Sequence, residues 1–300
     1  MKPPLGRDLF ILAFDHRGSI ERDLLKLPGK PSPAEQELIR SLKAVIFEGS
    51  RIAWERTQTG EVAILVDEGY GATAISRARE AGIPFAINVE KSGQAVFDFE
   101  YGDAFAEHID KANPDYVKTL VRYNPADEGQ LKATQLALLK VLSDAVAARP
   151  ARLLLEVLVP PAAGVNDTDP IAFAARERPG LVARTMAEFQ AAGIQADIWK
   201  LEGINSSEDC ARVVQQARAG GRDSVACIIL GAGASSETVD GWLRAAAPVD
   251  GFRGFAIGRS IWWTEIGEYV AGRLDAGSAA ARIADNFDRF VMVYTGAAAS

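Results

Sequence analysis

The sequence predicts a single (β/α)8 barrel, and three observations indicate this fold class. The chain has 300 residues, of which 48% are hydrophobic and 24% are charged, as in a globular protein with a large core. Short apolar runs alternate with longer amphipathic segments, and this strand–helix unit occurs eight times. No low-complexity linker divides the series, and no G-x-G-x-x-G motif follows the first run. We therefore expect one domain over residues 1–300, a barrel with a C-terminal helix, rather than an open doubly wound sheet.

The eight expected strands are four to nine residues long, rich in Val, Ile, Leu and Phe, and bounded by Gly, Pro, Asp or Asn. This pattern is typical of buried parallel strands. The strands are expected at Phe10–Asp15, Val62–Asp67, Pro84–Val89, Tyr116–Arg122, Arg152–Pro160, Ile198–Leu201, Val225–Leu230 and Gly254–Ile257.

The amphipathic segments between the strands predict helices. Ser32 and Pro33 supply an N-cap and a first-turn proline for a long helix over Ala34–Thr59. The longest irregular stretch, Pro161–Pro179, is expected to be a loop over the carboxyl ends of the strands. The other helices are expected at Ala72–Glu80, Gly102–Lys111, Asp127–Ala147, Leu181–Ala191, Ser206–Ala219, Ser235–Ala246, Ile261–Gly272 and Ala279–Tyr294.

Composition and charge exclude several classes of function. With 33 Lys and Arg against 40 Asp and Glu, the net charge is −7, which argues against nucleic acid or an anionic membrane as a partner. No apolar run is long enough to span a bilayer. Two cysteines, Cys210 and Cys227, make no disulfide framework, so a cytoplasmic location is expected. His16 and His108 are the only histidines, too few for a three-His zinc site, and no metal or other cofactor is expected.

Ionisable residues interrupt six of the expected strands near their carboxyl ends, where barrel enzymes carry their catalytic groups. Burying an unpaired charge costs several kcal/mol, so these groups either form a structural ion-pair network or carry out chemistry. A lysine crowded by other cations and partly desolvated has a lowered pKa and becomes a nucleophile, and a neighbouring carboxylate can move protons. The residues are Asp15, His16, Arg17, Asp67, Glu68, Glu90, Lys91, Lys118, Arg122, Glu156, Lys200 and Glu202.

The last two expected strands end in small residues that suit a phosphate group. Gly231 and Gly233 lie in the run from Leu230 to Ser236, and Gly258 precedes Arg259. Backbone N–H groups at a helix N-terminus and a guanidinium both bind phosphate, and barrel enzymes often build phosphate sites after strands seven and eight. Glycine is also simply a turn residue, but two such loops with an arginine favour a phosphorylated ligand.

Eight motifs then occur in a recognisable order: ILAFDHRGSIERDLL, ILVDEGYGATA, FAINVEKSG, DYVKTLVRYNP, LLLEVLV, IWKLEG, LGAGASSE and AIGRSIWW. In these motifs, from Leu9 to about Trp263, the chain resembles the class I aldolases of the tagatose-1,6-bisphosphate type. It is more similar still to the aldolase-like domain that is fused to 5-dehydro-2-deoxygluconokinase in bacterial myo-inositol catabolism. His16, where the tagatose type has Gln, and the order Asp67-Glu68-Gly69-Tyr70 depart from the tagatose pattern.

The resemblance implies a role for each candidate residue. Lys200 would form the Schiff base, Glu156 would be the acid–base group, and Lys118 would be an auxiliary lysine. Asp15 and Arg17 would contact substrate hydroxyls or the proton relay. The phosphate would lie on Ser235, Arg259 and the backbone of Gly231–Gly233, beside Gly258.

The expected reaction is the cleavage of 2-deoxy-5-keto-gluconate 6-phosphate to dihydroxyacetone phosphate and malonate semialdehyde. Tagatose 1,6-bisphosphate or a sulfosugar phosphate are alternative substrates. Two further hypotheses stay open, a non-catalytic barrel that binds a sugar phosphate and an isomerase or epimerase that uses Glu156 and Asp15 as an acid–base pair. Barrels of this type are often symmetric assemblies, so a homo-oligomer also stays open.

Overall fold

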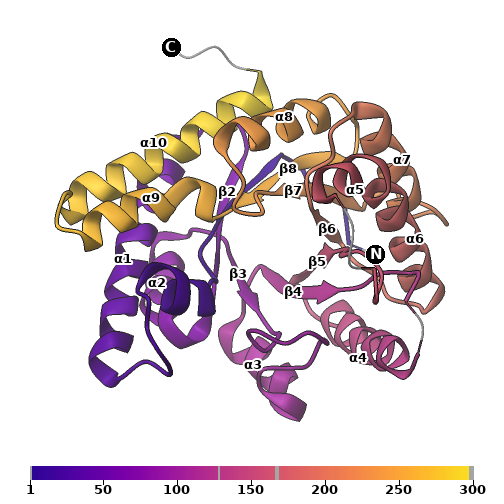
Figure 1. Cartoon of the computed structure of the whole chain (residues 1–300), viewed down its shortest axis with the longest axis horizontal. Helices are drawn as coiled ribbons and strands as arrows, with labels where there is room; N and C mark the ends of the chain where they lie inside the picture. Colours follow the sequence, from indigo (N-terminus) through magenta and orange to yellow (C-terminus); the bar gives the residue numbers. More distant parts are fainter. Residues whose placement is uncertain (1, 128, 166–168, 297–300) are drawn as a thin grey trace.

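The structure is a computed structural model that describes residues 2–127, 129–165 and 169–296. Its eight parallel strands pair in chain order, and β1 pairs with β8, so the predicted (β/α)8 barrel is confirmed (Figure 1). The strands are β1 (Leu9–Ala13), β2 (Glu61–Val66), β3 (Phe85–Asn88), β4 (Tyr116–Arg122), β5 (Arg152–Leu158), β6 (Ile198–Leu201), β7 (Ala226–Leu230) and β8 (Phe252–Ile257).

Helices surround the barrel, and the long C-terminal helix α10 packs against α1, α8 and α9 (Figure 1). The described part of the chain also forms a π-helical turn η1 (Ile20–Leu24) and a 3-10 turn η2 (Gly102–Ala104). The helices are α1 (Pro33–Arg56), α2 (Glu68–Ala81), α3 (Phe105–Ala112), α4 (Gln130–Ala147), α5 (Pro170–Arg176), α6 (Arg178–Ala191), α7 (Ser207–Ala217), α8 (Ser236–Ala246), α9 (Arg259–Val270) and α10 (Ala276–Thr295).

The stretch Pro161–Pro179 differs from the sequence prediction, because it contains the helix α5 and is not wholly irregular. The Asp169 carboxylate caps this helix by accepting two backbone N–H bonds, and Pro170 occupies its first turn. Phe173 anchors it by burying its ring. Seven residues are too few to give a clear helical period, which is why the sequence pattern missed it.

An apolar layer fills the interior of the barrel beneath the carboxyl ends of the strands. Side chains two residues apart on a strand face the same side, so the residue two positions after a member of this layer also points into the barrel. On three neighbouring strands that next residue is charged. The pairs are Tyr116 and Lys118 on β4, Leu154 and Glu156 on β5, and Ile198 and Lys200 on β6.

The barrel closes where β8 approaches β1 at Gly254, and this position requires glycine. Gly254 has φ of 116° and pairs with Leu9 in the sheet register. A Cβ atom there would lie 2.1 Å from the backbone oxygen of Leu9. We expect Gly254→Ala to lower the free energy of unfolding by roughly 2–4 kcal/mol, measured by urea titration. Gly241→Ala, on α8 with open space around its Cα, is the control, and equal stability of the two variants would contradict this account of barrel closure.

Candidate active site

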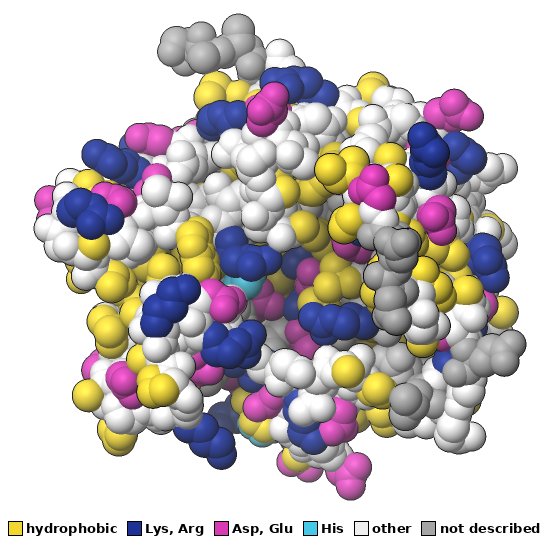
Figure 2. Space-filling view, viewed as in Figure 1, with side chains coloured by type: hydrophobic (Ala, Val, Ile, Leu, Met, Phe, Trp, Pro, Cys, Tyr) yellow, Lys and Arg dark blue, Asp and Glu magenta, His cyan; other side chains and the backbone are white. Residues whose placement is uncertain are grey.

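A cavity of about 510 Å³ opens at the carboxyl ends of the strands. Residues on or directly after every strand except β2 line it. Figure 2 shows it as a hollow in which basic, acidic and histidine side chains gather. Seven basic side chains and five carboxyl groups line the cavity, although the chain as a whole carries a charge of −7. An anionic ligand is therefore favoured here.

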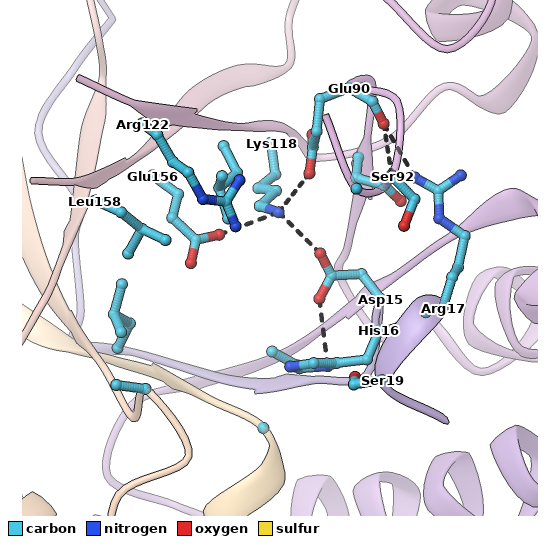
Figure 3. A pocket seen from close by; sticks show the side chains of 18 of the residues that line it. Asp15, His16, Arg17, Ser19, Glu90, Ser92, Lys118, Arg122, Glu156 and Leu158 are labelled. Atoms are coloured by element: carbon cyan, nitrogen blue, oxygen red, sulfur yellow. Dashed lines mark hydrogen bonds and ion pairs between the residues drawn. The ribbon is translucent and has the colours of Figure 1, made fainter. Parts of the chain in front are cut away.

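Lys118 lies at the centre of the buried charges, and its side chain is 3% exposed. Its Nζ is 2.9 Å from Asp15 Oδ2, 2.6 Å from Glu90 Oε1 and 3.0 Å from Glu156 Oε2 (Figure 3). Burial alone would lower the pKa of Lys118, but the three carboxylates together raise it well above its usual value. Lys118 therefore stays an ammonium ion at neutral pH.

Lys200 has a different environment on β6, which is separated from β4 by β5. Its Nζ is 3.0 Å from Glu156 Oε2, the same oxygen that contacts Lys118. Glu156 is its one ion-pair partner among the described residues. The two buried lysines are thus unequal, because three carboxylates hold the proton of Lys118 while Lys200 shares a single carboxylate oxygen. Of the two, Lys200 is the better candidate nucleophile.

The three carboxyl groups around Lys118 also differ from one another. Burial is the largest single influence on Asp15 and Glu156 and would raise their pKa values, but the charges of Lys118 and Lys200 and the hydrogen bonds from these lysines together lower both pKa values. Burial raises the pKa of Glu90, and Lys118 only partly opposes this. Asp15 and Glu156 are therefore ionised at neutral pH, and Glu90 is the carboxyl group most readily protonated.

His16 lines the cavity next to Asp15, with its Nδ1 3.8 Å from Asp15 Oδ1 and no hydrogen-bond partner among the described residues. Its ring meets Trp262 edge to face at a centroid distance of 5.5 Å. Burial lowers the pKa of His16 to about 4, although the Asp15 carboxylate opposes this shift. The imidazole is therefore neutral at pH 7, able to donate or accept a hydrogen bond.

Gly231, Gly233, Gly258 and Arg259 line the wall of the cavity that follows β7 and β8, on the side of the barrel opposite β4. Arg259 begins α9 and donates to the carbonyl oxygen of Ala232 at 3.0 Å, and no carboxylate pairs with it among the described residues. Gly233 has φ of 72°, and a Cβ there would lie 2.8 Å from the guanidinium carbon of Arg259. This wall thus offers an unpaired guanidinium beside a helix N-terminus, as a phosphate site requires.

Ser235 does not line the cavity, contrary to the sequence expectation. Its hydroxyl accepts the backbone N–H of Thr238 and so caps α8, and it also hydrogen-bonds to Thr238 Oγ1 at 2.9 Å. A serine before a helix serves equally as a cap or as a phosphate ligand, and the sequence alone does not distinguish the two.

Arg17 lines the cavity, but its guanidinium already binds other residues of the chain. It donates to the carbonyl oxygen of Glu90 at 3.0 Å (Figure 3). It also pairs with Glu100 at 3.1 Å. Arg17 therefore holds the loop after β3 against the loop after β1. The sequence did not predict that Glu90 would contact Lys118, because it showed only a charge at the end of a strand.

Among the described residues, no group of three or more His, Cys, Asp or Glu side chains is arranged to hold a metal ion. Likewise, none of the helices in the described part of the chain is long and apolar enough to cross a membrane.

The fold and the cavity define a (β/α)8-barrel protein with a buried lysine–carboxylate site and a cationic wall. The chain belongs to the family described as "Uncharacterized protein conserved in bacteria (DUF2090)", whose model matches residues 2–298. No curated protein matches the chain.

Two solved structures share the barrel. The crystal structure of Cgl0159 from Corynebacterium glutamicum is 18% identical with a TM-score of 0.60, covering 98% of this chain and 88% of its own. An archaeal fructose 1,6-bisphosphate aldolase is 15% identical with a TM-score of 0.57, covering 97% of this chain and 94% of its own. At these identities the similarity supports the fold.

Proposed function

We propose that this protein is a class I aldolase in which Lys200 forms a Schiff base with a phosphorylated keto-sugar or keto-sugar acid. The observation that carries the proposal is the inequality of the two buried lysines. Lys118 is held as an ammonium ion by three carboxylates, whereas Lys200 lies 3.0 Å from Glu156 alone at the end of β6. The likeness to an archaeal fructose 1,6-bisphosphate aldolase supports the same class of reaction.

In the proposed reaction Lys200 passes its ammonium proton to Glu156, 3.0 Å away, and its amine attacks the keto carbon. The carbonyl oxygen takes up that proton and one amine proton and leaves as water, which gives an iminium and restores the Glu156 carboxylate. Glu156 takes a proton from the hydroxyl group on the carbon beyond the bond to be broken. The carbon–carbon bond then breaks, its electron pair enters the iminium to form an enamine, and the aldehyde leaves. Protonation of the enamine and hydrolysis of the iminium release dihydroxyacetone phosphate and restore Lys200.

The neighbouring groups support these steps. The Lys118 ammonium lies 3.0 Å from Glu156 and helps to keep that carboxylate ionised as a base. Asp15 pairs with Lys118 on the side of the site next to the neutral His16 imidazole, so both are available to substrate hydroxyls. The phosphate of the substrate would lie on Arg259 and the backbone at Gly231, Gly233 and Gly258.

For the substrate we propose 2-deoxy-5-keto-gluconate 6-phosphate, on the resemblance to the aldolase-like domain of myo-inositol catabolism. Cleavage would give dihydroxyacetone phosphate and malonate semialdehyde. A ketose 1,6-bisphosphate, either tagatose or fructose bisphosphate, is the second candidate, favoured by the archaeal relative. A coupled assay that reduces dihydroxyacetone phosphate with NADH tests these compounds and a sulfosugar phosphate side by side.

We expect the keto-acid phosphate to have the highest kcat/KM in this assay. Release of no dihydroxyacetone phosphate from any of them would contradict the proposal. Exchange of substrate hydrogen with deuterated water, without cleavage, would support the isomerase hypothesis, and binding without turnover or exchange would support a non-catalytic barrel.

Arg259→Gln tests the phosphate wall. Because a hydrogen bond to a charged group contributes about 1.5–3 kcal/mol, we expect KM to rise roughly 10–100-fold with a smaller change in kcat. Arg212→Gln, on the exposed surface of α7, is the matched control and should behave as the unmodified protein. An unchanged KM for Arg259→Gln would place the phosphate elsewhere.

A further inference from the structure

A second arginine without a carboxylate partner lies across the cavity from Arg259. Arg122 is the last residue of β4, and it lines the cavity together with Lys118 and Leu120 of the same strand face. Because the eight strands follow one another around a closed barrel, β4 lies opposite β8. The guanidinium of Arg122 therefore stands on the wall that faces the proposed phosphate site.

The contacts of Arg122 leave its charge uncompensated within the described residues. Its guanidinium donates one hydrogen bond, to the carbonyl oxygen of Gln94 at 3.3 Å, and forms no ion pair among these residues. Other charged groups on this wall already have partners. Lys91 pairs with Asp98, and Glu202 pairs with Arg178 at 3.4 Å while accepting the backbone N–H of Val159 at 2.9 Å.

Two other basic side chains of the cavity do not offer an equivalent charge on this wall. Arg17 pairs with Glu100. Arg22 lies in η1, which follows β1, and β1 is the strand next to β8. Arg17 is thus already paired, and Arg22 belongs to the side of the barrel that carries Arg259. Arg122 is therefore the one unpaired guanidinium opposite Arg259 among the described residues.

The order of the strands around the barrel also matches the order of the chemical groups along the proposed substrate. The phosphate wall follows β7 and β8, Lys200 is on β6, Glu156 is on β5, and Arg122 ends β4. If the keto carbon lies at Lys200 and the hydroxyl group lies at Glu156, the rest of the carbon chain extends toward β4. Figure 3 shows the Arg122 side chain directed toward the part of the cavity that holds Glu156 and Lys118.

We propose that Arg122 forms a second anion subsite, so that the substrate carries an anionic group at the end remote from its phosphate. This inference rests on the proposed function for the orientation of the substrate. A planar guanidinium binds a carboxylate or a phosphate through paired hydrogen bonds, and the cavity volume of about 510 Å³ accommodates a six-carbon compound with two such groups.

Three inert six-carbon ligands test the subsite by isothermal titration calorimetry. Glucitol 6-phosphate has one anionic end, 6-phosphogluconate has a carboxylate at the other end, and glucitol 1,6-bisphosphate has a second phosphate there. We expect the protein to bind at least one of the two doubly anionic ligands about 10–100-fold more tightly than glucitol 6-phosphate. Whichever is preferred identifies the anion as carboxylate or phosphate.

In Arg122→Gln this preference should disappear, while the affinity for glucitol 6-phosphate stays unchanged. Arg122→Lys should retain part of it, Arg259→Gln should weaken all three ligands, and Arg212→Gln should change nothing. A preference that survives in a folded Arg122→Gln variant, or equal binding of the three ligands by the unmodified protein, would overturn the proposal.

Schiff-base trapping with dihydroxyacetone phosphate, which lacks the second anion, separates this inference from the proposed function. Trapping in Arg122→Gln at the unmodified level is expected. If trapping fails in the unmodified protein while the ligand preference depends on Arg122, the aldolase proposal fails and the subsite stands. If trapping succeeds and no preference exists, the subsite alone fails.

Discussion

Replacing Lys200 by methionine is expected to lower aldol cleavage on the order of 10³-fold or more, because the iminium that accepts the electron pair can no longer form. Methionine approximates the length of the lysine chain without its amine. The variant should still fold, since Glu156 keeps Lys118 as a partner at 3.0 Å. The coupled assay for dihydroxyacetone phosphate measures the loss.

Lys140→Met is the matched control, because Lys140 lies on the outer helix α4, where its side chain pairs with Asp144 and is 40% exposed. It should retain full activity. If Lys200→Met keeps more than about a tenth of the activity, covalent catalysis by Lys200 is wrong, and Lys118 or an acid–base mechanism must be considered.

Lys118→Met is expected to cause the largest loss of stability, about 3–5 kcal/mol at pH 8, since removing one member of a buried ion cluster leaves the others uncompensated. Asp15, Glu90 and Glu156 all contact the Lys118 ammonium at 3.0 Å or less. Without it, three buried carboxylates would face one another, with Lys200 left as a partner of Glu156 only. Urea titration of the variant and the unmodified protein at several pH values measures the effect.

The loss of stability in Lys118→Met should become smaller as the pH falls from 8 to 5. In the unmodified protein the pKa values of Asp15 and Glu156 are lowered on folding. The stability that these groups add is therefore complete above their unfolded pKa values of about 4 and does not change between pH 8 and pH 5. In the variant, burial and mutual repulsion would raise the carboxylate pKa values on folding, so the folded state would gain stability as protons bind. This gain by the variant brings the two proteins closer together at pH 5.

Lys118 itself adds a second pH dependence. Because its pKa is raised on folding, its contribution is complete below its unfolded pKa and is lost only as the pH rises through the folded value. The difference between the two proteins should therefore persist from pH 7 to pH 9. A loss of stability that is the same at pH 5 and pH 8 would contradict the arrangement of one ammonium among three carboxylates.

Most of the barrel follows from the sequence because its signals are local. The runs at Tyr116–Arg122 and Ile198–Leu201 were predicted with the same bounds that β4 and β6 have. A charged residue inside such a run, as with Glu156, predicts a functional or paired group because the interior otherwise excludes charge. On this reasoning the sequence predicts that Lys118, Glu156 and Lys200 share one site. The strand register places them on the consecutive strands β4, β5 and β6.

The features that the sequence did not predict depend on contacts between distant segments. Glu90 gained its role only from its 2.6 Å contact with Lys118, 28 residues away in the chain. Ser235 has the same local pattern whether it binds phosphate or caps a helix, and the structure shows its hydroxyl as the cap of α8. From the sequence, Arg122 is only a charged residue at the end of a strand. The structure shows that its guanidinium donates to the carbonyl oxygen of Gln94 and has no carboxylate partner among the described residues.

The most direct test of the central claim is to incubate the protein with dihydroxyacetone phosphate and sodium borohydride and to map the modified peptides by mass spectrometry. A reduced phosphate-bearing adduct on Lys200, absent without the ligand and absent in Lys200→Met, is the expected result. An unmodified Lys200 in protein that binds dihydroxyacetone phosphate, or an adduct on Lys118 in its place, would contradict the assignment of Lys200 as the Schiff-base lysine.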